Sequence, residues 1–252
     1  MTVLIDTDNA MGSPSGDVDD AFAIAALIRS GVHVAAISSV AGNTSEARAH
    51  DNNQRLCRIL GWRGPLLRGV EVPHFLRSAE PMRILALGPL TNLVGAPASE
   101  IIIVGGNSTS RGRWPPVWPH EFNLTKNRSA AYAVLQSSVP LTIFPLNVAR
   151  QLFCTRKELD TLKGPVADYL RRGSKRWFRR LRALKLTGRF PIYDLAAALY
   201  VVSEDGFTME RTTIDTRANT FIRFGAGSRE VLLCRALHRR RLQQRAAELL
   251  SE

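Results

Sequence analysis

The sequence predicts a layered α/β fold with a largely parallel sheet, and two observations support this prediction. Short apolar runs alternate with longer segments of helical character from the N-terminus to about residue 146. Such alternation is typical of parallel strands joined by helices. The chain has 252 residues, of which 45% are hydrophobic, so it is long enough to bury a real core. Because no repeat or linker interrupts it, we expect one domain over residues 1–252.

The first predicted strand covers residues 3–8 (VLIDTD), a short apolar run that ends in two carboxylates. This pattern is typical of a buried parallel strand that carries polar side chains to the edge of a sheet. A loop rich in Gly, Ser and Pro follows over residues 9–16. Residues 21–28 (AFAIAALI) then predict an apolar helix. The aspartates at positions 17, 19 and 20 precede it, where negative charge suits the positive end of the helix dipole.

Later segments predict a second helix and further strands that end at the same edge of the sheet. The helix covers residues 45–60, and the strands cover residues 32–40, 83–87, 101–104 and 141–146. Folds of this class bind ligands at the carboxyl ends of their parallel strands. This edge is therefore predicted to hold a polar site that includes Asp6, Asp8, Asn43, Leu87, Gly88, Gly105, Gly106, Asn107 and Asn147.

The net charge of +12 comes largely from one segment of the chain. Nine of the 34 Lys and Arg residues lie within residues 171–189, which contain no acid, and the charge of all other residues is only +3. The pattern of this segment, with Arg171, Lys175, Arg179, Arg182, Trp177, Phe178, Leu181 and Leu184, predicts an amphipathic helix. Its basic face fits a solvated surface, a contact for an anion or nucleotide phosphate, or a patch for RNA or a membrane.

Cysteine usage and hydropathy favour a cytoplasmic protein. Cys57, Cys154 and Cys234 are far apart and form no CxxC pair, so we interpret them as small apolar residues rather than disulfide or zinc partners. No apolar run approaches the ~18 to 20 residues that span a bilayer, and the N-terminus lacks a basic segment before an apolar one. We therefore expect no membrane partner.

The strongest chemical signal is the group of Asp6, Asp8, Asp19 and Asp20 at a strand end and a helix start. Carboxylates gathered in this way repel one another and raise one another's pKa unless a cation neutralises them. The cation would be a hard one: Ca²⁺ accepts six to eight oxygen ligands, whereas Mg²⁺ takes fewer and usually a phosphate. The simpler alternative is an acidic N-cap on a surface helix.

Six sequence blocks, taken in order, resemble the inosine-uridine nucleoside hydrolase family. They are Asp6-Thr7-Asp8, Asp19-Asp20-Ala21, Val40-Ala41-Gly42-Asn43, Leu87-Gly88-Pro89-Leu90-Thr91-Asn92, Glu121-Phe122-Asn123 and Asp194-Leu195-Ala196. Each block alone is weak, and the ordered set is specific. The resemblance implies a three-layer α/β/α, Rossmann-like, mostly parallel sheet of the nucleoside hydrolase type, and Ca²⁺-dependent hydrolysis of an N-riboside that releases ribose and base.

The resemblance also implies roles for individual residues. Asp8 resembles the family's metal ligand that also acts as general base. Asp20, Asp194 and the main-chain carbonyl of Leu87 resemble the other metal ligands. The residues that resemble ribose contacts are Asp19, Asn43, Asn107, Glu121, Asn123 and Asp194. Such a set suits the chemistry, because cleaving an N-glycosidic bond passes through an oxocarbenium-like state that carboxylates stabilise. Family members are commonly dimers or tetramers, so a homo-oligomer is expected.

Three features depart from the family pattern. The loop over residues 9–18 is longer than is usual, and Tyr193 stands where members commonly have His. A tyrosine of pKa ~10 gives up its proton less readily than a histidine of pKa ~6.5, so His120 is an alternative acid for the leaving base. The stretch over residues 69–83 is shorter, which predicts the loss of a helix and an open rim. A larger, nucleotide-like substrate could then place its phosphate near residues 171–189.

Other interpretations stay open at this point. The DxD at residues 6–8 also resembles that of haloacid-dehalogenase-like, Mg²⁺-dependent phosphatases, although a later Gly-Asp-x-x-x-Asp motif is absent. A degenerate hydrolase fold could instead serve as an anion-binding or nucleic-acid-binding module, but the retained acids make a nucleic-acid partner the weaker interpretation. Taken singly, residues 121–123 could be an ordinary loop, Asp194 a helix N-cap, and Asn43 a turn residue.

Overall fold

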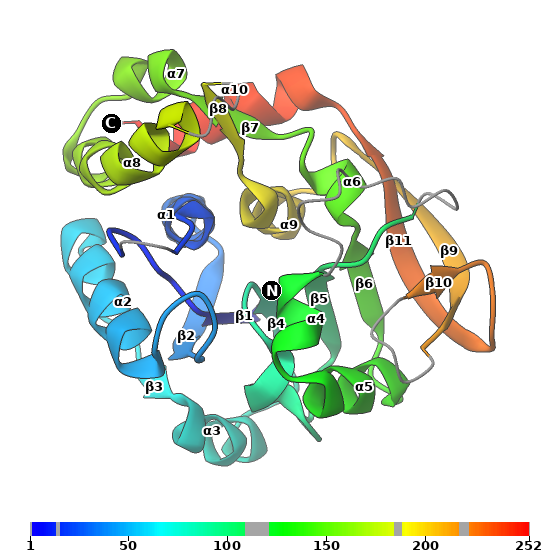
Figure 1. The fold of residues 1–252 in the computed structure, drawn as a ribbon. Coiled ribbons are helices and arrows are strands. Elements are labelled where there is room, and N and C mark those ends of the chain that lie inside the picture. Colours follow the sequence, from blue (N-terminus) through cyan, green and yellow to red (C-terminus); the bar gives the residue numbers. More distant parts are fainter. Residues whose placement is uncertain (1, 14–15, 109–120, 184–187, 217–221, 252) are drawn as a thin grey trace.

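The computed structural model describes residues 2–13, 16–108, 121–183, 188–216 and 222–251, and its centre is a nine-stranded sheet of order β10-β9-β11-β6-β5-β4-β1-β2-β3 (Figure 1). Its strands are β1 (Thr2–Thr7), β2 (His33–Ser39), β3 (Leu66–Arg68), β4 (Arg83–Ala86), β5 (Glu100–Val104), β6 (Leu141–Phe144), β9 (Phe207–Asp215), β10 (Arg223–Phe224) and β11 (Arg229–Leu237). A second, two-stranded sheet pairs β7 (Phe153–Thr155) with β8 (Arg189–Pro191).

Helices cover both faces of the large sheet. They are α1 (Asp19–Arg29), α2 (Glu46–Leu60), α3 (Val72–Ser78), α4 (Phe122–Lys126), α5 (Arg128–Gln136), α6 (Leu146–Ala149), α7 (Arg156–Thr161), α8 (Pro165–Ala183), α9 (Tyr193–Val202) and α10 (Arg239–Leu250), with 3₁₀ turns η1 (Gly69–Glu71) and η2 (Leu90–Leu93). In Figure 1, α1, α8, α9 and α10 lie on one side of the sheet, and α3 and α5 lie on the other. The described residues contain no helix that is both long and apolar enough to cross a membrane.

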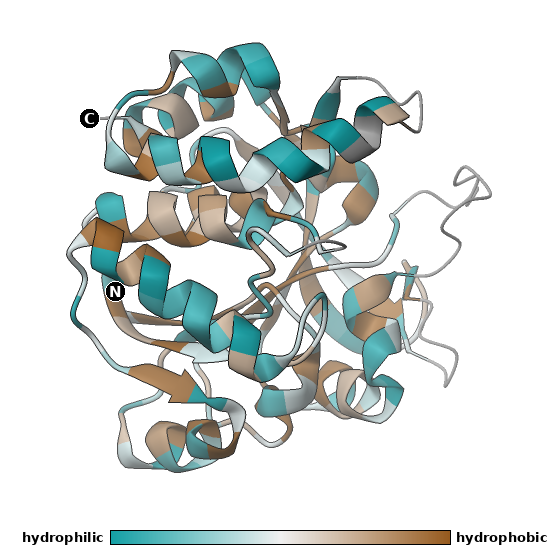
Figure 2. Ribbon diagram, turned by 60° about the vertical axis from the view of Figure 1, so that its left-hand side comes forward, coloured by the Kyte–Doolittle hydropathy of each residue, from teal (hydrophilic) through white to brown (hydrophobic). Residues whose placement is uncertain are grey.

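Alternating side chains of the central strands form two cores, one on each face of the sheet. In β1, Val3 and Ile5 belong to the core under α1 and α9, whereas Leu4 belongs to the core under α3 and α5. The strands are buried on both faces, as expected for parallel strands covered by helices. Figure 2 shows the result, with hydrophobic strands at the centre and hydrophilic residues on the outward faces of the surrounding helices. The three-layer α/β/α prediction is thus confirmed.

The pairing of the strands is parallel except at one edge. From β3 through β2, β1, β4, β5 and β6 to β11, every neighbouring pair is parallel. Beyond β11, however, β9 pairs antiparallel with both β11 and β10. The sequence analysis predicted β1, β2, β4, β5 and β6, but neither the short edge strand β3 nor the strands β9, β10 and β11 at the other edge.

Other predicted elements need correction in detail. The strand predicted over residues 141–146 ends at Phe144, because Pro145 lacks an N–H and the helix α6 begins at Leu146. Asn147 therefore lies in a helix and not at a strand end. The shortened stretch over residues 69–83 still holds η1 and α3. The predicted basic helix is confirmed up to Ala183 as the last part of α8. Leu184 lies outside the described residues, and Arg189 begins β8.

Candidate active site

The carboxyl end of β1 and the N-terminus of α1 bring four of the predicted aspartates into one region. Asp6, Asp8, Asp19 and Asp20 are all buried, with at most 4% of their surface exposed. Asp17, which the sequence analysis gave no role in the site, joins them: carboxylate oxygens of Asp17, Asp19 and Asp20 lie within 4.8 Å of one another. Its signal was present in the sequence as a third acid before the helix. The described ends of the loop after Asp8 lie close together, since a Cβ at Gly16 would lie 2.2 Å from Ala10 Cβ, and this brings Asp17 back to the cluster.

Asp8 lies in a tight cradle made by two glycines. Its Oδ2 accepts a hydrogen bond from the backbone N–H of Asn43 at 2.5 Å. A Cβ atom at Gly42 would lie 1.9 Å from this Oδ2, and one at Gly88 would lie 3.0 Å from the Asp8 backbone nitrogen. Burial raises the pKa of Asp8 to about 7. The buried Oδ1 has no hydrogen-bond partner among the described residues.

Two further acids of the cluster each keep one buried oxygen without a hydrogen bond. Asp20 accepts a hydrogen bond from the Thr7 hydroxyl on Oδ1, and Asp17 accepts one from Asn43 Nδ2 on Oδ2 at 3.0 Å. The second oxygen of each carboxylate, Asp20 Oδ2 and Asp17 Oδ1, has no partner among the residues described. Burial, with repulsion from neighbouring aspartates, raises the pKa of both groups well above the usual range.

The start of α9 supplies Asp194 and Tyr193 from a distant part of the chain. Asp19 Oδ2 accepts a hydrogen bond from the Tyr193 backbone N–H at 3.1 Å, which ties α1 to α9. Burial, followed by repulsion from Asp19, Asp20, Asp17 and Asp8, raises the pKa of Asp194 well above its usual range. Asp194 lies inside the first turn of α9, whose N-cap is Ile192, so it is not the cap of this helix.

Tyr193 is half-buried beside this cluster. Burial, with a smaller contribution from Asp19, raises the pKa of its hydroxyl to about 12. The side chain therefore keeps its proton at neutral pH. His120, the alternative acid, lies outside the described residues.

A second group of predicted residues meets at the end of β4 and the start of α4. Asn123 Nδ2 donates a hydrogen bond to the carbonyl oxygen of Leu87 at 2.9 Å. Glu121 is the N-cap of α4, and its two oxygens accept hydrogen bonds from the backbone N–H groups of Asn123 and Leu124 at 3.1 and 2.6 Å. Burial raises the pKa of Glu121 to about 7. Leu87 also joins this group to β1, because its N–H donates to the Asp6 carbonyl at 2.8 Å.

The remaining predicted residues lie at the edges of the site. Asp6 Oδ1 accepts hydrogen bonds from Ser38 Oγ at 2.6 Å and from Asn92 Nδ2 at 2.8 Å, which holds β1 to its neighbours. Its Oδ2 is buried and, like one oxygen of Asp8, Asp17 and Asp20, has no partner among the described residues. Asn107 follows Gly106, whose φ of +77° makes the turn after β5. Asn147 Oδ1 accepts a hydrogen bond from the backbone N–H of Ser108 at 2.9 Å. Asn147 therefore lies close to the turn after β5, although it is part of helix α6.

Buried amides that the sequence analysis did not single out fix the loop after Asp8. Asn9 Nδ2 donates to Asn53 Oδ1 at 2.9 Å, and Asn52 Nδ2 donates to the Asn9 carbonyl at 2.9 Å. Asn53 Nδ2 in turn donates to Ser39 Oγ at 3.2 Å. These contacts join the start of the loop to α2 and β2.

The donor set of the aspartate cluster fits a hard cation. Asp8, Asp17 and Asp20 each contribute a buried carboxylate oxygen that no described residue hydrogen-bonds. A buried anionic oxygen without a partner is costly unless a cation or proton neutralises it. All these ligand atoms are oxygens, which suits Ca²⁺ or Mg²⁺ better than softer metals. The cluster could therefore hold a metal ion.

Known nucleoside hydrolases resemble this chain in sequence and in fold. The chain is 24% identical to the non-specific ribonucleoside hydrolase RihC of Escherichia coli, over 83% of this chain and 82% of that protein. A plant nucleoside hydrolase structure superposes with a TM-score of 0.84 at 20% identity, covering 99% of this chain and 98% of that one. An inosine-uridine preferring nucleoside hydrolase from Bacillus anthracis superposes with a TM-score of 0.78 at 13% identity, with the same coverage.

The match to a family extends over most of the chain. Residues 70–241 match the inosine-uridine preferring nucleoside hydrolase family. This range contains Leu87, Glu121, Asn123 and Asp194, while the aspartates of β1 and α1 precede it. The chain therefore belongs to the inosine-uridine preferring nucleoside hydrolase family.

Proposed function

We propose that this protein is a Ca²⁺-dependent hydrolase that cleaves the N-glycosidic bond of a ribonucleoside and releases ribose and base. The observation that carries the proposal is the set of buried, unpartnered carboxylate oxygens on Asp8, Asp17 and Asp20 in a nucleoside hydrolase fold. The relatives of this protein named above are nucleoside hydrolases and not phosphatases, so they give no support to the phosphatase interpretation.

The metal would be held by Asp8, Asp20, Asp194 and the carbonyl oxygen of Leu87. Among the described residues that carbonyl accepts one hydrogen bond, from Asn123, and so keeps a second lone pair for a ligand. Asp17 is an additional candidate because one of its buried oxygens has no partner among the described residues. When bound, Ca²⁺ would orient the ribose hydroxyls and the attacking water and make that water more acidic.

The protein's own groups would carry the proton and charge of the reaction. Asp8 Oδ1, which no described residue hydrogen-bonds, would take the proton of the water that attacks the anomeric carbon. The remaining aspartates would stabilise the positive charge that develops on the ribose ring. Asp19, Asn43, Asn107, Glu121, Asn123 and Asp194 are the proposed ribose contacts.

Tyr193 is the proposed donor to the leaving base. Because its pKa is raised to about 12, the hydroxyl would act by donating a hydrogen bond rather than by transferring its proton fully. Substrates whose bases leave without full protonation should therefore react faster than those that need a strong acid.

The decisive experiment measures free ribose released from a panel of purine and pyrimidine ribonucleosides, with Ca²⁺ and after chelation. We expect ribose release only with the metal, and Asp8→Asn to lower kcat by roughly 10² to 10⁴, the range for loss of a general base. Asp51→Asn, an exposed acid of α2, is the matched control and should keep full activity. Full turnover by Asp8→Asn, or release of phosphate but not ribose from nucleotides, would contradict the proposal.

We also propose a homodimer or homotetramer located in the cytoplasm. Support for assembly comes from large apolar side chains that are exposed on η1 and α5, namely Val70 at 85% and Tyr132 at 48%. All three cysteines are free and buried, which suits a reducing compartment. Light scattering on the purified chain measures the mass of the assembly, and a monomer would contradict this part of the proposal.

A further inference from the structure

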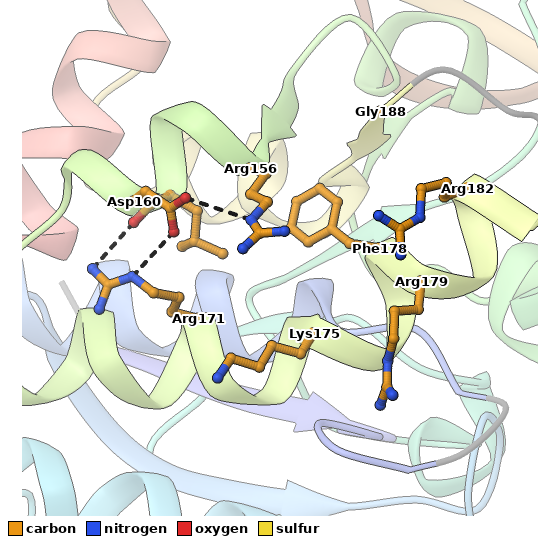
Figure 3. Close-up of a pocket in the computed structure, with 9 residues that line it drawn as sticks. Arg156, Asp160, Arg171, Lys175, Phe178, Arg179, Arg182 and Gly188 are labelled. Carbon is orange, nitrogen blue, oxygen red and sulfur yellow. Dashed lines mark hydrogen bonds and ion pairs between the residues drawn. The ribbon is translucent and has the colours of Figure 1, made fainter.

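We propose that a basic pocket between α7 and α8 is a second binding site, separate from the aspartate cluster, for a phosphorylated small molecule of about nucleotide size. The pocket has a volume of about 720 Å³, within the usual range for small-molecule sites. Its lining consists of Arg156, Leu159, Asp160, Arg171, Lys175, Phe178, Arg179, Arg182 and Gly188 (Figure 3).

The pocket follows from the side-chain spacing on α8. Positions 171, 175, 178 and 182 are separated by four, three and four residues, so they share one face of the helix. Gly173 lies on the other side of the helix, where a Cβ would lie 2.0 Å from Met11 Sδ. The buried Ser174 flanks the pocket-lining face. One side of α8 thus packs on the loop that follows β1, while another side lines the pocket.

The charge of the lining is strongly positive. It contains five cationic side chains and one acid, Asp160. Arg156 and Arg171 both pair with that acid, at 3.6 and 3.5 Å, as the dashed lines of Figure 3 show. By contrast, Lys175 and Arg182 have no ion pair or hydrogen bond among the described residues. Cations left unpaired around a concavity suit a phosphate group.

The pocket also has an apolar wall that a bare phosphate would leave unused. Leu159 is buried, and the half-buried Phe178 ring packs on Phe190 with its centroid 5.0 Å away. At Gly188 a Cβ would meet no atom within 4 Å, so there is room beside this residue. An aromatic or aliphatic group attached to a phosphate would therefore bury apolar surface against Phe178 and Leu159.

A small ligand fits these observations better than RNA does. Binding of a long polyanion needs cations spread along an exposed track, with aromatic faces open for stacking. Here the cations surround a pocket between α7 and α8 and do not form an extended track. This interpretation assigns to residues 171–182 the anion contact that the sequence left as one of several alternatives.

The test titrates ADP into the metal-free full-length protein, in EDTA, by calorimetry. We expect binding that Lys175→Gln/Arg182→Gln weakens by about tenfold or more, since each lost charge-assisted hydrogen bond costs on that scale. The matched control is Arg172→Gln/Arg176→Gln, which removes the same charge from exposed positions of the same helix that do not line the pocket. It should bind ADP within about twofold of the unchanged protein.

Further probes separate the contributions of phosphate and apolar wall. Pyrophosphate should displace ADP but bind more weakly than ADP does. Adenosine, which lacks a phosphate, should not displace ADP. Equal loss of ADP binding in both double variants, no binding by the unchanged protein, or much tighter binding of a single-stranded oligonucleotide that both variants abolish would each overturn the proposal.

A second measurement needs no variant. In the unchanged protein, ADP should protect Lys175 from acetylation, as measured by mass spectrometry, while the exposed Lys157 and Lys163 react as they do without ligand. Equal labelling of Lys175 with and without ADP would contradict a site between α7 and α8.

Discussion

The two acidic regions of the candidate site differ in how their carboxylates are satisfied. Around β1, α1 and α9, the oxygens Asp8 Oδ1, Asp17 Oδ1 and Asp20 Oδ2 are buried without a hydrogen-bond partner among the described residues. At the start of α4, both oxygens of Glu121 accept hydrogen bonds from backbone N–H groups. Burial raises the pKa in both regions. A raised pKa alone therefore does not distinguish a metal ligand from a helix cap.

The hydrogen-bond partners of each carboxylate distinguish a metal ligand from a helix cap. The N–H groups that meet Glu121 would otherwise lack partners at the start of the helix, so that carboxylate already has a structural role. The aspartate cluster has more carboxylate oxygens than protein donors, so a cation or bound protons must neutralise it, and a bound cation would replace those protons. The comparison predicts that metal and steric changes affect the cluster far more than the cap.

The largest difference between the aspartate cluster and the Glu121 cap should appear in stability and Ca²⁺ binding when one methyl group is added beside Asp8 or beside Glu121. A Cβ at Gly42 would lie 1.9 Å from Asp8 Oδ2, whereas one at Gly105 would lie 3.2 Å from the Glu121 carboxyl carbon. Gly42→Ala must displace the Asp8 carboxylate, so we expect loss of Ca²⁺ binding and ribose release, and destabilisation by about 1–3 kcal/mol. Gly105→Ala should cost less than about 1 kcal/mol. Thermal unfolding and calorimetric Ca²⁺ titration measure both effects, and equal effects would contradict the comparison.

The next largest difference is whether neutralising an acid raises or lowers Tm, with and without Ca²⁺. Without metal, Asp20→Asn relieves repulsion within the cluster, and its remaining carbonyl can still accept from the Thr7 hydroxyl. We expect it to raise Tm in EDTA by about 2–4 °C, and to lower Tm relative to the unchanged protein when Ca²⁺ is present.

Glu121→Gln is the control for this reversal, because it neutralises an acid whose oxygens are both hydrogen-bonded. Its change in Tm should have the same sign with and without Ca²⁺. A change of sign there, or the lack of one for Asp20→Asn, would show that the cation is held elsewhere.

The sequence was sufficient for the central strands and for most of the acids. The runs of β1, β4 and β5 are almost continuously apolar, a pattern typical of parallel strands covered on both faces. Asp8, Asp19 and Asp20 are adjacent to a strand end or a helix start, so local rules place them. Asp194 was reached only through the family resemblance, because its residue type alone is equally typical of a helix cap.

Features that depend on the path of a loop or on packing between distant segments were missed. Asp17 reaches the cluster only because the loop after Asp8 folds back, and Asn9 holds that loop through a bond to Asn53, 44 positions away. The pocket depends on how α7 packs against α8. The antiparallel pairing of β9 with β11 depends equally on contacts that no local pattern encodes.

The smallest expected effect is a pH dependence that belongs to the cap. Two backbone N–H groups lower the pKa of Glu121, while burial raises it, and burial dominates to give a value of about 7. Because this folded-state pKa lies above the ordinary value of 4.5, the contribution of Glu121 to stability is complete below about pH 4.5 and is lost as the pH rises to about 7.

We therefore compare the free energy of unfolding of the unchanged protein with that of Glu121→Gln, in EDTA, from pH 4.5 to pH 8. The difference should shift against the unchanged protein by on the order of 1–3 kcal/mol between about pH 5 and 7, and become constant above that. Both proteins contain the aspartate cluster, so taking the difference between their free energies of unfolding removes the contribution of its titration. A difference that does not vary with pH would mean that the two N–H donors offset burial completely. Glu121 would then be an ordinary ionised cap whose charge the fold fully accommodates.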